Sequence, residues 1–242
     1  MNEQLVITCE HGGNRVPAPY ARLFRATRRA LQSHRAYDPG ALDLARLLAR
    51  RLRAPLFFSC TTRLLVDLNR SVTHRSLFSR ITSQLSSREK QAIISAYYVP
   101  LRERAAALVA RAIDQGCRVI HLSIHTFAPV LRGRIRNADI GLLYDPSRDR
   151  ERELATALRA AILETVPWIG RHRLRIRRNY PYRGTSDGFT ASLRHRFPTN
   201  RYAGIELEVN QRWARGSKTQ WAKLQKAIAD AAARLWDNST PM

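Results

Sequence analysis

The sequence lacks the features that mark several specialised classes of protein. It has three cysteines among 242 residues, and none belongs to a CxxC pair or an evenly spaced framework. Cys9, Cys60 and Cys117 lie in or beside apolar runs, so we expect reduced thiols of the interior. No apolar run approaches the roughly 18 to 20 residues needed to cross a bilayer, and Met1–Thr8 does not resemble a signal peptide. These absences favour a cytoplasmic protein without a membrane role.

Acidic residues are also scarce, because 19 Asp and Glu stand against 42 Lys and Arg and leave a formal net charge of +23. Such an excess can indicate a nucleic-acid partner. The arginines, however, are scattered among aliphatic residues in stretches of helical period, and no zinc finger, RNP signature or GxxG loop accompanies them. We therefore interpret the charge as solvated helix faces, expect no specific nucleic-acid partner, and expect the surface to attract anionic substrates.

Short β-branched runs alternate along the chain with longer stretches of 3.6-residue period. This alternation predicts an α/β protein in which helices cover both faces of a sheet. No repeat, low-complexity linker or charge block marks a boundary, so we predict a single domain over residues 1–242. The expected strands are Leu5–Cys9, Leu56–Ser59, Leu64–Leu68, Val119–Ile124, Ile140–Tyr144, Leu174–Arg177 and Ile205–Val209. The expected helices are Ala41–Leu52, Glu89–Gln115, Glu151–Thr165 and Lys218–Trp236.

The second expected helix carries its own start and break signals. Ser86 and Glu89 have the spacing of a capping box, in which each side chain bonds the other residue's backbone N–H. Pro100 lies inside the helix and lacks a backbone N–H, so we expect it to kink or split the helix.

Three polar stretches resist a regular interpretation, and each follows a predicted strand: Glu10–Tyr20, Asn69–Gln84 and Asn179–Tyr202. In open α/β sheets, ligands bind outside the carboxyl ends of the strands. We therefore expect the functional site in these loops.

Two predicted strands end in a histidine. His11 follows the first strand and precedes a pair of glycines, which allow the backbone to approach a ligand or an ion closely. His125 ends the fourth strand, while His121 lies deeper on the same face and is expected to be structural. Two strand-end histidines and one carboxylate would form the open three-ligand site of a catalytic zinc ion.

Several carboxylates are candidates for the third ligand and for a general base. Asp38 precedes a predicted helix, where helix capping is the alternative role, and Glu10 lies beside His11. Glu206 and Glu208 share one face of the last predicted strand, and a buried strand would not carry two carboxylates without a partner or a metal. An edge strand with one solvated face is the alternative. We choose Glu208 as the general base because it is nearer the carboxyl end of the strand.

Substrate contacts are expected from two of the loops. Asn69 and Arg70 follow the third predicted strand, where an Arg fork beside an amide could grip a carboxylate; an Arg70–Asp67 salt bridge is the alternative. The loop that contains Asn179 and Tyr182 is expected to cover the site and to contact the substrate. A cysteine mechanism is disfavoured, because the chain has no GxSxG elbow and Cys9 lies within a strand.

Taken in order, these segments resemble the N-formylglutamate amidohydrolase family, and the resemblance runs from Val6 to about Arg212. It is carried by the segments Glu10–Pro17 (EHGGNRVP), Tyr37–Ala41 (YDPGA), Arg63–Arg70 (RLLVDLNR), Ser123–Phe127 (SIHTF), Asp139–Asp145 (DIGLLYD), Asn179–Tyr182 (NYPY) and Glu206–Gln211 (ELEVNQ).

The resemblance implies a phosphorylase/hydrolase-like α/β fold related to zinc carboxypeptidases: a three-layer sandwich with a mixed, mostly parallel central sheet. It also implies that His11 and His125 bind zinc, that Glu208 is the base, and that Asn69 with Arg70 holds a substrate carboxylate. Related enzymes have Glu three residues after the first histidine, where this chain has Asn14. The second ligand is therefore open, with Asp38 preferred over Glu10 and Asn14.

The resulting hypothesis is a zinc-dependent amidohydrolase acting on a small substrate that carries a carboxylate. The family's namesake reaction converts N-formyl-L-glutamate to L-glutamate and formate, in histidine degradation. A zinc peptidase or a deacylase for another N-acyl amino acid is an alternative. A non-catalytic basic binding protein on the same scaffold is a second one.

Overall fold

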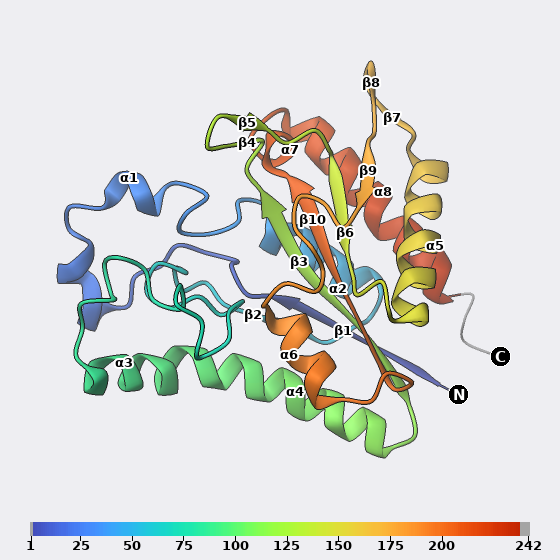
Figure 1. Ribbon diagram of the computed structural model, residues 1–242. Coiled ribbons are helices and arrows are strands. Elements are labelled where there is room, and N and C mark those ends of the chain that lie inside the picture. The colour runs from blue at the N-terminus through green and yellow to red at the C-terminus, as the bar shows by residue number, and fades with distance from the viewer. Residues whose placement is uncertain (1, 238–242) are drawn as a thin grey trace.

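The computed structural model describes residues 2–237, and its centre is a six-stranded sheet (Figure 1). The strand order is β2-β1-β3-β10-β6-β9, and all neighbours are parallel except β10 and β6. The strands are β1 Glu3–Cys9, β2 Leu56–Phe58, β3 Arg118–Phe127, β6 Ile140–Leu143, β9 Ile176–Arg178 and β10 Tyr202–Asn210. Two ribbons lie outside this sheet: β4 Val130–Leu131 with β5 Arg134–Ile135, and β7 Trp168–Ile169 with β8 His172–Arg173.

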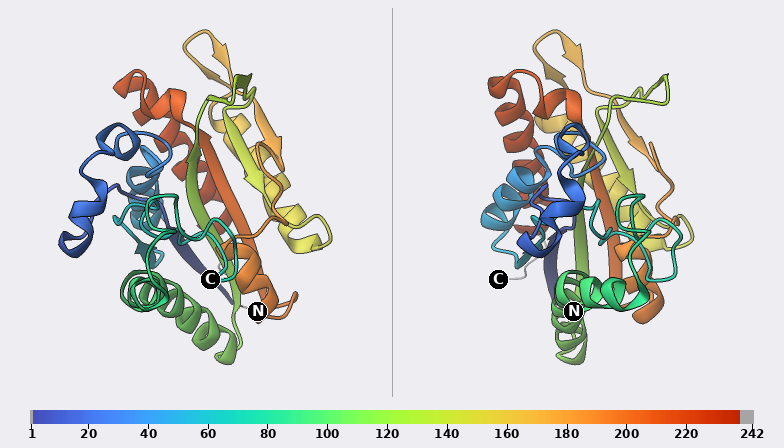
Figure 2. Two further views of the ribbon diagram at one scale, coloured as in Figure 1. Left: turned by 60° about the vertical axis from the view of Figure 1, so that its left-hand side comes forward. Right: turned by 90° about the vertical axis from the view of Figure 1, so that its left-hand side faces the viewer.

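Helices cover both faces of the sheet, as two further views show (Figure 2). The helices are α1 Arg28–Leu31, α2 Ala41–Arg51, α3 Ser87–Ile93, α4 Val99–Asp114, α5 Asp149–Thr165, α6 Phe189–Arg196, α7 Gln211–Ala214 and α8 Lys218–Asp237. Apolar residues of α2, α5 and α8 form one core with the sheet, and those of α4 and α6 form a second core on the other face. The three-layer α/β fold with a mixed, mostly parallel sheet is therefore confirmed.

The two longest strands, β3 and β10, lie at the centre and are buried along nearly their whole length. A strand buried on both faces is expected to be continuously apolar, yet these two alternate apolar and polar residues. Ile120, Leu122 and Ile124 pack in the core beneath α2, α5 and α8. The intervening His121, Ser123 and His125 face the other side, so this face of the sheet requires internal partners for its polar groups.

One predicted strand is wrong. Residues 64–68 form turns outside the sheet, although Leu65, Val66 and Leu68 are fully buried. They pack into the core that α4 and α6 share, so their burial comes from helices rather than from strand neighbours. A short apolar run reports burial, and its period does not distinguish a buried strand from a buried turn.

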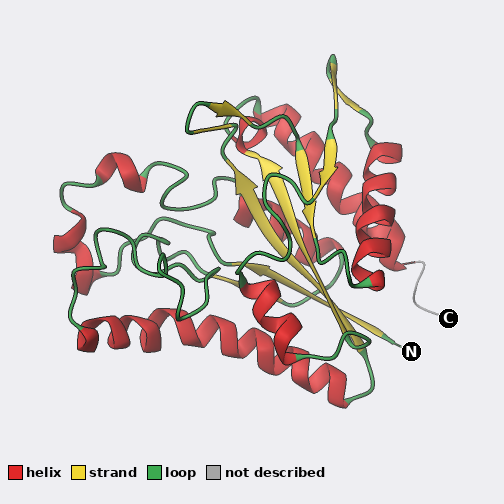
Figure 3. Cartoon of the chain, viewed as in Figure 1, coloured by secondary structure: helices red, strands yellow, loops and turns green. Residues whose placement is uncertain are grey.

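The long helix expected over 89–115 begins at Ser87 and changes pitch midway (Figure 3). Its start is capped as predicted, because Ser86 and Glu89 form a reciprocal capping box. A π-helical segment, η2 Ile94–Tyr98, separates α3 from α4, and Pro100 lies in the first turn of α4. The wider turn accommodates a residue that offers no N–H and whose ring would clash with the preceding turn. A further 3₁₀ segment, η1 Ala18–Phe24, lies in the loop after β1. Among residues 2–237, no helix combines the length and the apolar character needed to cross a membrane.

Gly141 on β6 lets another chain segment pass directly over the sheet. A Cβ atom at this position would lie 1.8 Å from the carbonyl oxygen of Tyr180 and 3.4 Å from the Cβ atom of Glu208. No side chain fits in this space, and the obstruction is backbone, which cannot rotate away.

We predict that Gly141→Ala lowers the free energy of unfolding by about 2 to 3 kcal/mol, because the methyl group displaces the Tyr180 segment. Ser87→Ala, at an exposed helical position, provides a control that should leave stability nearly unchanged. Urea denaturation of both variants measures the difference. Equal midpoints for Gly141→Ala and the unmodified chain would show that the segment does not lie against β6.

Candidate metal centre

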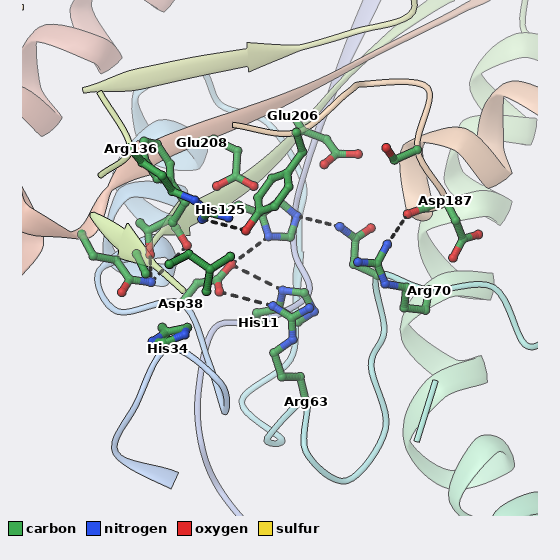
Figure 4. Close-up of a pocket in the computed structure, with 18 of the residues that line it drawn as sticks. His11, His34, Asp38, Arg63, Arg70, His125, Arg136, Asp187, Glu206 and Glu208 are labelled. Carbon is green, nitrogen blue, oxygen red and sulfur yellow. Dashed lines mark hydrogen bonds and ion pairs between the residues drawn. The ribbon is translucent and has the colours of Figure 1, made fainter. Parts of the chain in front are cut away.

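Two histidines and one aspartate meet at the carboxyl ends of β1 and β3 (Figure 4). His11 follows β1 and His125 lies near the end of β3, and since these strands are parallel neighbours the two rings lie 5.1 Å apart. One nitrogen of each ring and one carboxylate oxygen of Asp38 all lie within 4.8 Å of one another, and all three residues are buried. These are the three metal ligands that the sequence predicts.

The loop that carries Asp38 is tied to both strands. The Asp38 N–H donates to the carbonyl of His11, and the Thr126 hydroxyl donates to the carbonyl of Pro39. The N-cap of α2 is Gly40, with φ of 82°, and no side chain caps the helix. Asp38 therefore has no capping role, and its carboxylate is directed to the two histidines.

Each histidine contacts Asp38 through Nδ1 and a different carboxylate through Nε2. For His11, Nδ1 lies 3.4 Å from Asp38 Oδ2 and Nε2 lies 2.7 Å from Asp67 Oδ1. For His125, Nδ1 lies 2.9 Å from Asp38 Oδ2 and Nε2 lies 3.1 Å from Glu10 Oε2. An outer carboxylate on the far nitrogen is the usual arrangement of a metal-binding histidine, since it fixes the tautomer and the orientation of the ring.

An unsatisfied buried atom supports a cation at this place. His11 Nδ1 is buried without a hydrogen-bond partner, although it points toward Asp38. Buried polar atoms nearly always have a partner, so an orphan indicates a missing ligand or ion. Two imidazole nitrogens and a carboxylate oxygen are donors that suit zinc. The residues present thus fit a divalent cation.

The charges of the cluster lead to the same conclusion. Glu10, Asp38 and Asp67 are buried carboxylates, and Arg63 is the one guanidinium in contact with them, 2.5 Å from Asp67 and 3.7 Å from Asp38. With neutral imidazoles, three negative charges and one positive charge leave two uncompensated negative charges. Burying such charges is costly without a counter-ion, and a divalent cation balances them.

Without a metal, protons take over part of this role. Burial works against ionisation of Asp38 and Asp67, yet the pKa of both carboxyls lies well below the usual range. For Asp38 the cause is its contacts with His11 and His125, and for Asp67 it is the charges of Arg63 and His11. Burial likewise disfavours a charged imidazole, yet hydrogen bonds to Asp38 and Glu10 raise the pKa of His125 well above its usual value. A metal ion must displace these imidazole protons, so binding should release protons.

Glu208 lies beside the three ligands on the central strand β10. It is the register partner of His125, and its Oε2 atom is buried without a hydrogen-bond partner. The pKa of its carboxyl is raised to about 8. Burial is the main cause, the charges of Asp38 and Glu206 act in the same direction, and His125 opposes them. Glu206, two residues earlier, accepts a hydrogen bond from Thr190 at 2.5 Å. Because β10 is central, the edge-strand explanation for this pair is excluded.

A pocket of about 330 Å³ opens in front of the ligands. It is lined by residues of all three predicted loops. Its four arginines outnumber its three carboxylates other than Asp38. Besides the ligands and the two glutamates, the lining residues that matter for chemistry are Arg63, Asn69, Arg70, Arg136, Tyr182, Arg183 and Asp187.

Three of the four predicted substrate-binding residues line the pocket. Arg70 lies in the pocket wall, and its Nη1 donates to the Asp187 carbonyl at 2.6 Å; the Arg70–Asp67 salt bridge considered as an alternative does not form. Asn69 lines the pocket, and its Oδ1 accepts the Phe189 N–H at 2.6 Å. Tyr182 lines the pocket as well.

Asn179 is not among the pocket residues. Its Oδ1 accepts the N–H groups of Tyr144 and Gly184, each at 3.0 Å, and its φ of 49° makes the turn that follows β9. It therefore shapes the covering loop, and the structure does not bring it to the site. Asn14, the third candidate ligand, also turns away and donates to the Leu31 carbonyl at 2.8 Å.

The glycine pair after His11 was predicted to let the backbone approach a ligand or an ion, but it lies against another segment of the chain. Cβ atoms at Gly12 and Gly13 would lie 2.9 Å and 2.7 Å from the carbonyl oxygens of Ser59 and Cys60. The close approach is thus to the chain that follows β2 rather than to a ligand or an ion.

Sequence reasoning missed two residues that surround the ligands. Asp67 was considered only as a partner for Arg70, and its bond to His11 depends on a turn that was predicted as a strand. Arg136 was overlooked; it lines the pocket, donates to the Tyr182 hydroxyl at 2.9 Å and stacks 4.8 Å from that ring's centre. The i,i+4 spacing of Arg63 and Asp67 was a usable signal for their ion pair, whereas nothing local identifies Arg136.

The fold and the cluster geometry define an α/β protein with a buried group of His11, Asp38 and His125 that could hold a metal ion. The family model for N-formylglutamate amidohydrolase matches residues 3–214, so the chain belongs to the N-formylglutamate amidohydrolase family. No curated protein matches it significantly.

Two solved structures have the same fold, and a third is similar to a lower degree. A gene product from Agrobacterium tumefaciens is 28% identical with a TM-score of 0.75, over 96% of this chain and 91% of that one. An N-formylglutamate amidohydrolase from Ralstonia eutropha JMP134 is 19% identical with a TM-score of 0.72, over 98% and 94%. A metallo-carboxypeptidase from Burkholderia cenocepacia is 14% identical with a TM-score of 0.45, over 99% and 58%.

We predict that Glu208→Gln stabilises the metal-free protein at alkaline pH. The pKa of this carboxyl rises from 4.5 to about 8 on folding, so the free energy of unfolding of the protein falls as the pH rises from 4.5 through 8. Removing it should therefore add roughly 2 to 4 kcal/mol at pH 9 and little at pH 4.5. Chemical denaturation across this pH range, in chelator, measures the effect. Glu206→Gln is the matched control, and an equal gain in both variants would contradict the assignment.

Proposed function

We propose that the protein is a metal-dependent amidohydrolase that cleaves the amide of an N-acyl acidic amino acid, with N-formyl-L-glutamate as the first candidate. Family membership supports the reaction class. The observation that carries the proposal is the buried set of His11, Asp38 and His125, which together with Glu10, Asp67 and Arg63 has two uncompensated negative charges when the imidazoles are neutral. Zinc is the proposed metal, because two imidazoles and one carboxylate leave a coordination position open.

Within this proposal, zinc when bound supplies a Lewis acid that polarises the amide carbonyl and lowers the pKa of a water molecule. The protein's own contribution begins with Asp67 and Glu10, which hold the two imidazoles with Nδ1 turned inward. Arg63 keeps Asp67 ionised and in place through its ion pair. The ligand set is thereby preorganised, and little reorganisation remains for the reaction step.

Glu208 is the proposed general base. Its orphaned carboxylate oxygen lies beside His125 on a strand that is fixed on both sides. Without a metal, burial raises the pKa of this carboxyl to about 8, and a cation bound beside it would lower that pKa and favour the ionised form that a base requires. Glu208 accepts a proton from the attacking water and delivers it to the amine nitrogen as the carbon–nitrogen bond breaks. The products are a carboxylic acid, formate for a formyl group, and the free amino acid.

Arginines of the pocket supply the proposed contacts for substrate carboxylates. Arg70 is oriented by its bond to the Asp187 carbonyl, and Arg136 is oriented by Tyr182. An acidic amino acid carries two carboxylates, and these two guanidinium groups lie on different sides of the ligand set (Figure 4). Asn179 acts indirectly, by holding the loop on which Tyr182 lies.

A different acyl group or a small peptide remains the nearest alternative substrate, since a volume of about 330 Å³ accommodates several small amides. A role in histidine degradation and a location in the cytoplasm accompany the N-formyl-L-glutamate assignment and belong to the same proposal. So does a single catalytic domain over residues 1–242. A binding protein without catalysis would not need an orphaned Glu208 beside a complete ligand set.

We predict that His125→Ala abolishes metal retention and formate release from N-formyl-L-glutamate. Loss of one of three ligands removes most of the affinity, and His34→Ala, which changes a histidine of the same pocket outside the ligand set, should retain both. Metal analysis of the purified variants and a formate assay with and without chelator provide the readouts. Full turnover by folded His125→Ala would refute the metal assignment.

Removal of the Arg70 guanidinium should weaken substrate binding more than the reaction step. For Arg70→Ala, we expect KM for N-formyl-L-glutamate to rise at least about 10-fold with a smaller fall in kcat, because a charge-assisted bidentate contact is lost. Steady-state kinetics measure this, with the exposed Arg75→Ala as control. If kcat fell with KM unchanged, Arg70 would act on the reaction step and not hold the ground-state carboxylate.

A further inference from the structure

The strongest run of positive charge in the chain lies at the edge of the sheet, away from the ligands. Residues 171–183 contain six arginines and one histidine and no acidic residue. They form β8, the edge strand β9 and the turn that follows, and the β7–β8 ribbon projects beyond the body of the protein in Figures 1 and 2.

Four of these arginines alternate with buried residues. Arg171, Arg173, Arg175 and Arg177 are exposed, whereas Leu174 and Ile176 are buried in the core beneath α5 and α8. In extended chain, side chains on one face recur about every 7 Å. Arg173 lies in β8, Arg177 in β9, Arg175 between these strands and Arg171 in the turn before β8. This segment therefore presents a row of exposed guanidinium groups, which we call the arginine ladder and define as Arg171, Arg173, Arg175 and Arg177.

The guanidinium groups of the arginine ladder form no ion pair with a carboxylate within residues 2–237, although the backbone N–H of Arg175 donates to Asp139. Elsewhere, exposed arginines do form ion pairs, as Arg152 does with Asp149 at 2.7 Å and Arg196 with Glu103 at 3.1 Å. The ladder's contacts are of other kinds: Arg175 donates to the side chain of Asn137, and Arg177 stacks 4.2 Å from the ring centre of Tyr180. A row of unneutralised charge at this spacing is costly through mutual repulsion, and an anionic partner relieves that repulsion.

The surroundings of the ladder favour a linear partner. Two surface hollows run between α5 and the edge strand, and they share Arg159 and Ile176 as lining residues, so that they follow β8 and β9 from end to end. Arg159 and Arg178 add two more exposed guanidinium groups along them. Trp168, 50% exposed, is paired with Arg173 in the projecting ribbon and offers a flat aromatic face at one end.

We propose that the arginine ladder is a binding site for single-stranded nucleic acid, recognised through its phosphates and without sequence preference. A row of guanidinium groups on one exposed segment can contact several phosphates of a single strand, and the Arg fork matches phosphate geometry. Tyr180 and Trp168 provide stacking surfaces of the kind that single-strand binding uses. A membrane surface fits less well, because Leu174 and Ile176 point into the core and Trp168 is the one exposed apolar side chain of the ribbon and strand within the described residues.

The test is binding of a fluorescein-labelled 20-nucleotide oligouridylate to the full chain, followed by anisotropy at several salt concentrations. The ladder variant Arg173→Gln/Arg175→Gln/Arg177→Gln should bind at least about 10-fold more weakly. The slope of log K against log salt should fall in magnitude by about 2, since about 0.7 counterion is released per contact. The control variant Arg50→Gln/Arg88→Gln/Arg111→Gln removes the same charge from exposed helical positions and should bind within two-fold of the unmodified chain.

Three outcomes overturn the proposal. Equal weakening in both variants would show that net charge alone attracts the oligonucleotide. Absence of micromolar binding at physiological salt would leave the ladder as protection of an edge strand against pairing with other chains. Ladder-dependent binding to vesicles with 30% phosphatidylglycerol, without ladder-dependent binding to oligouridylate, would assign the surface to membranes. Thermal unfolding of both variants confirms that they are folded, and neither variant changes a residue of the proposed hydrolytic site.

Discussion

Three buried carboxylates and one partly buried guanidinium group surround two imidazoles at the ends of β1 and β3, and this excess of negative charge is the constraint on which the site depends. Glu10 and Asp67 fix the outer nitrogens of the rings, and Asp38 lies between the inner ones. Such a cluster is unfavourable in a low-dielectric interior unless protons or a cation complete it. The Nδ1 atom of His11, which is buried without a hydrogen-bond partner, marks the place where such a proton or cation is missing.

The fold supplies rigidity at that point. β3 and β10 are the two central strands and run parallel, so that His125 and Glu208 become register partners with strands on both sides. His11, His125 and Glu208 thus lie at or near the ends of strands, and Asp38 lies on a loop that is hydrogen-bonded to the ends of both β1 and β3, while the residues proposed to contact substrate lie on loops. The groups proposed to carry out the reaction are thus held in fixed positions, whereas the loops that contact the substrate can differ with the substrate.

Local sequence patterns predicted the layers, most strands, the capping box and the meeting of His11, Asp38 and His125, because most of these depend on period or on a strand-end position. They failed where tertiary packing decides. Residues 64–68 are buried by helices and form turns, which moves Asp67 to His11. Arg136 comes from a segment with no signal of its own and reaches the pocket through the β4–β5 ribbon. The arginine ladder was not predicted either. The positive charge was interpreted as belonging to helix faces, and the alternation of arginines over residues 171–177 was not considered.

The most direct measurement is anomalous diffraction at the zinc absorption edge from crystals grown with zinc. The account predicts one strong peak within bonding distance of His11 Nδ1, an Asp38 carboxylate oxygen and His125 Nδ1, with Asp67 and Glu10 still on the Nε2 atoms. A peak coordinated by other residues, or no peak among these three side chains in a well-ordered crystal, would contradict the claim that a divalent cation completes the buried cluster.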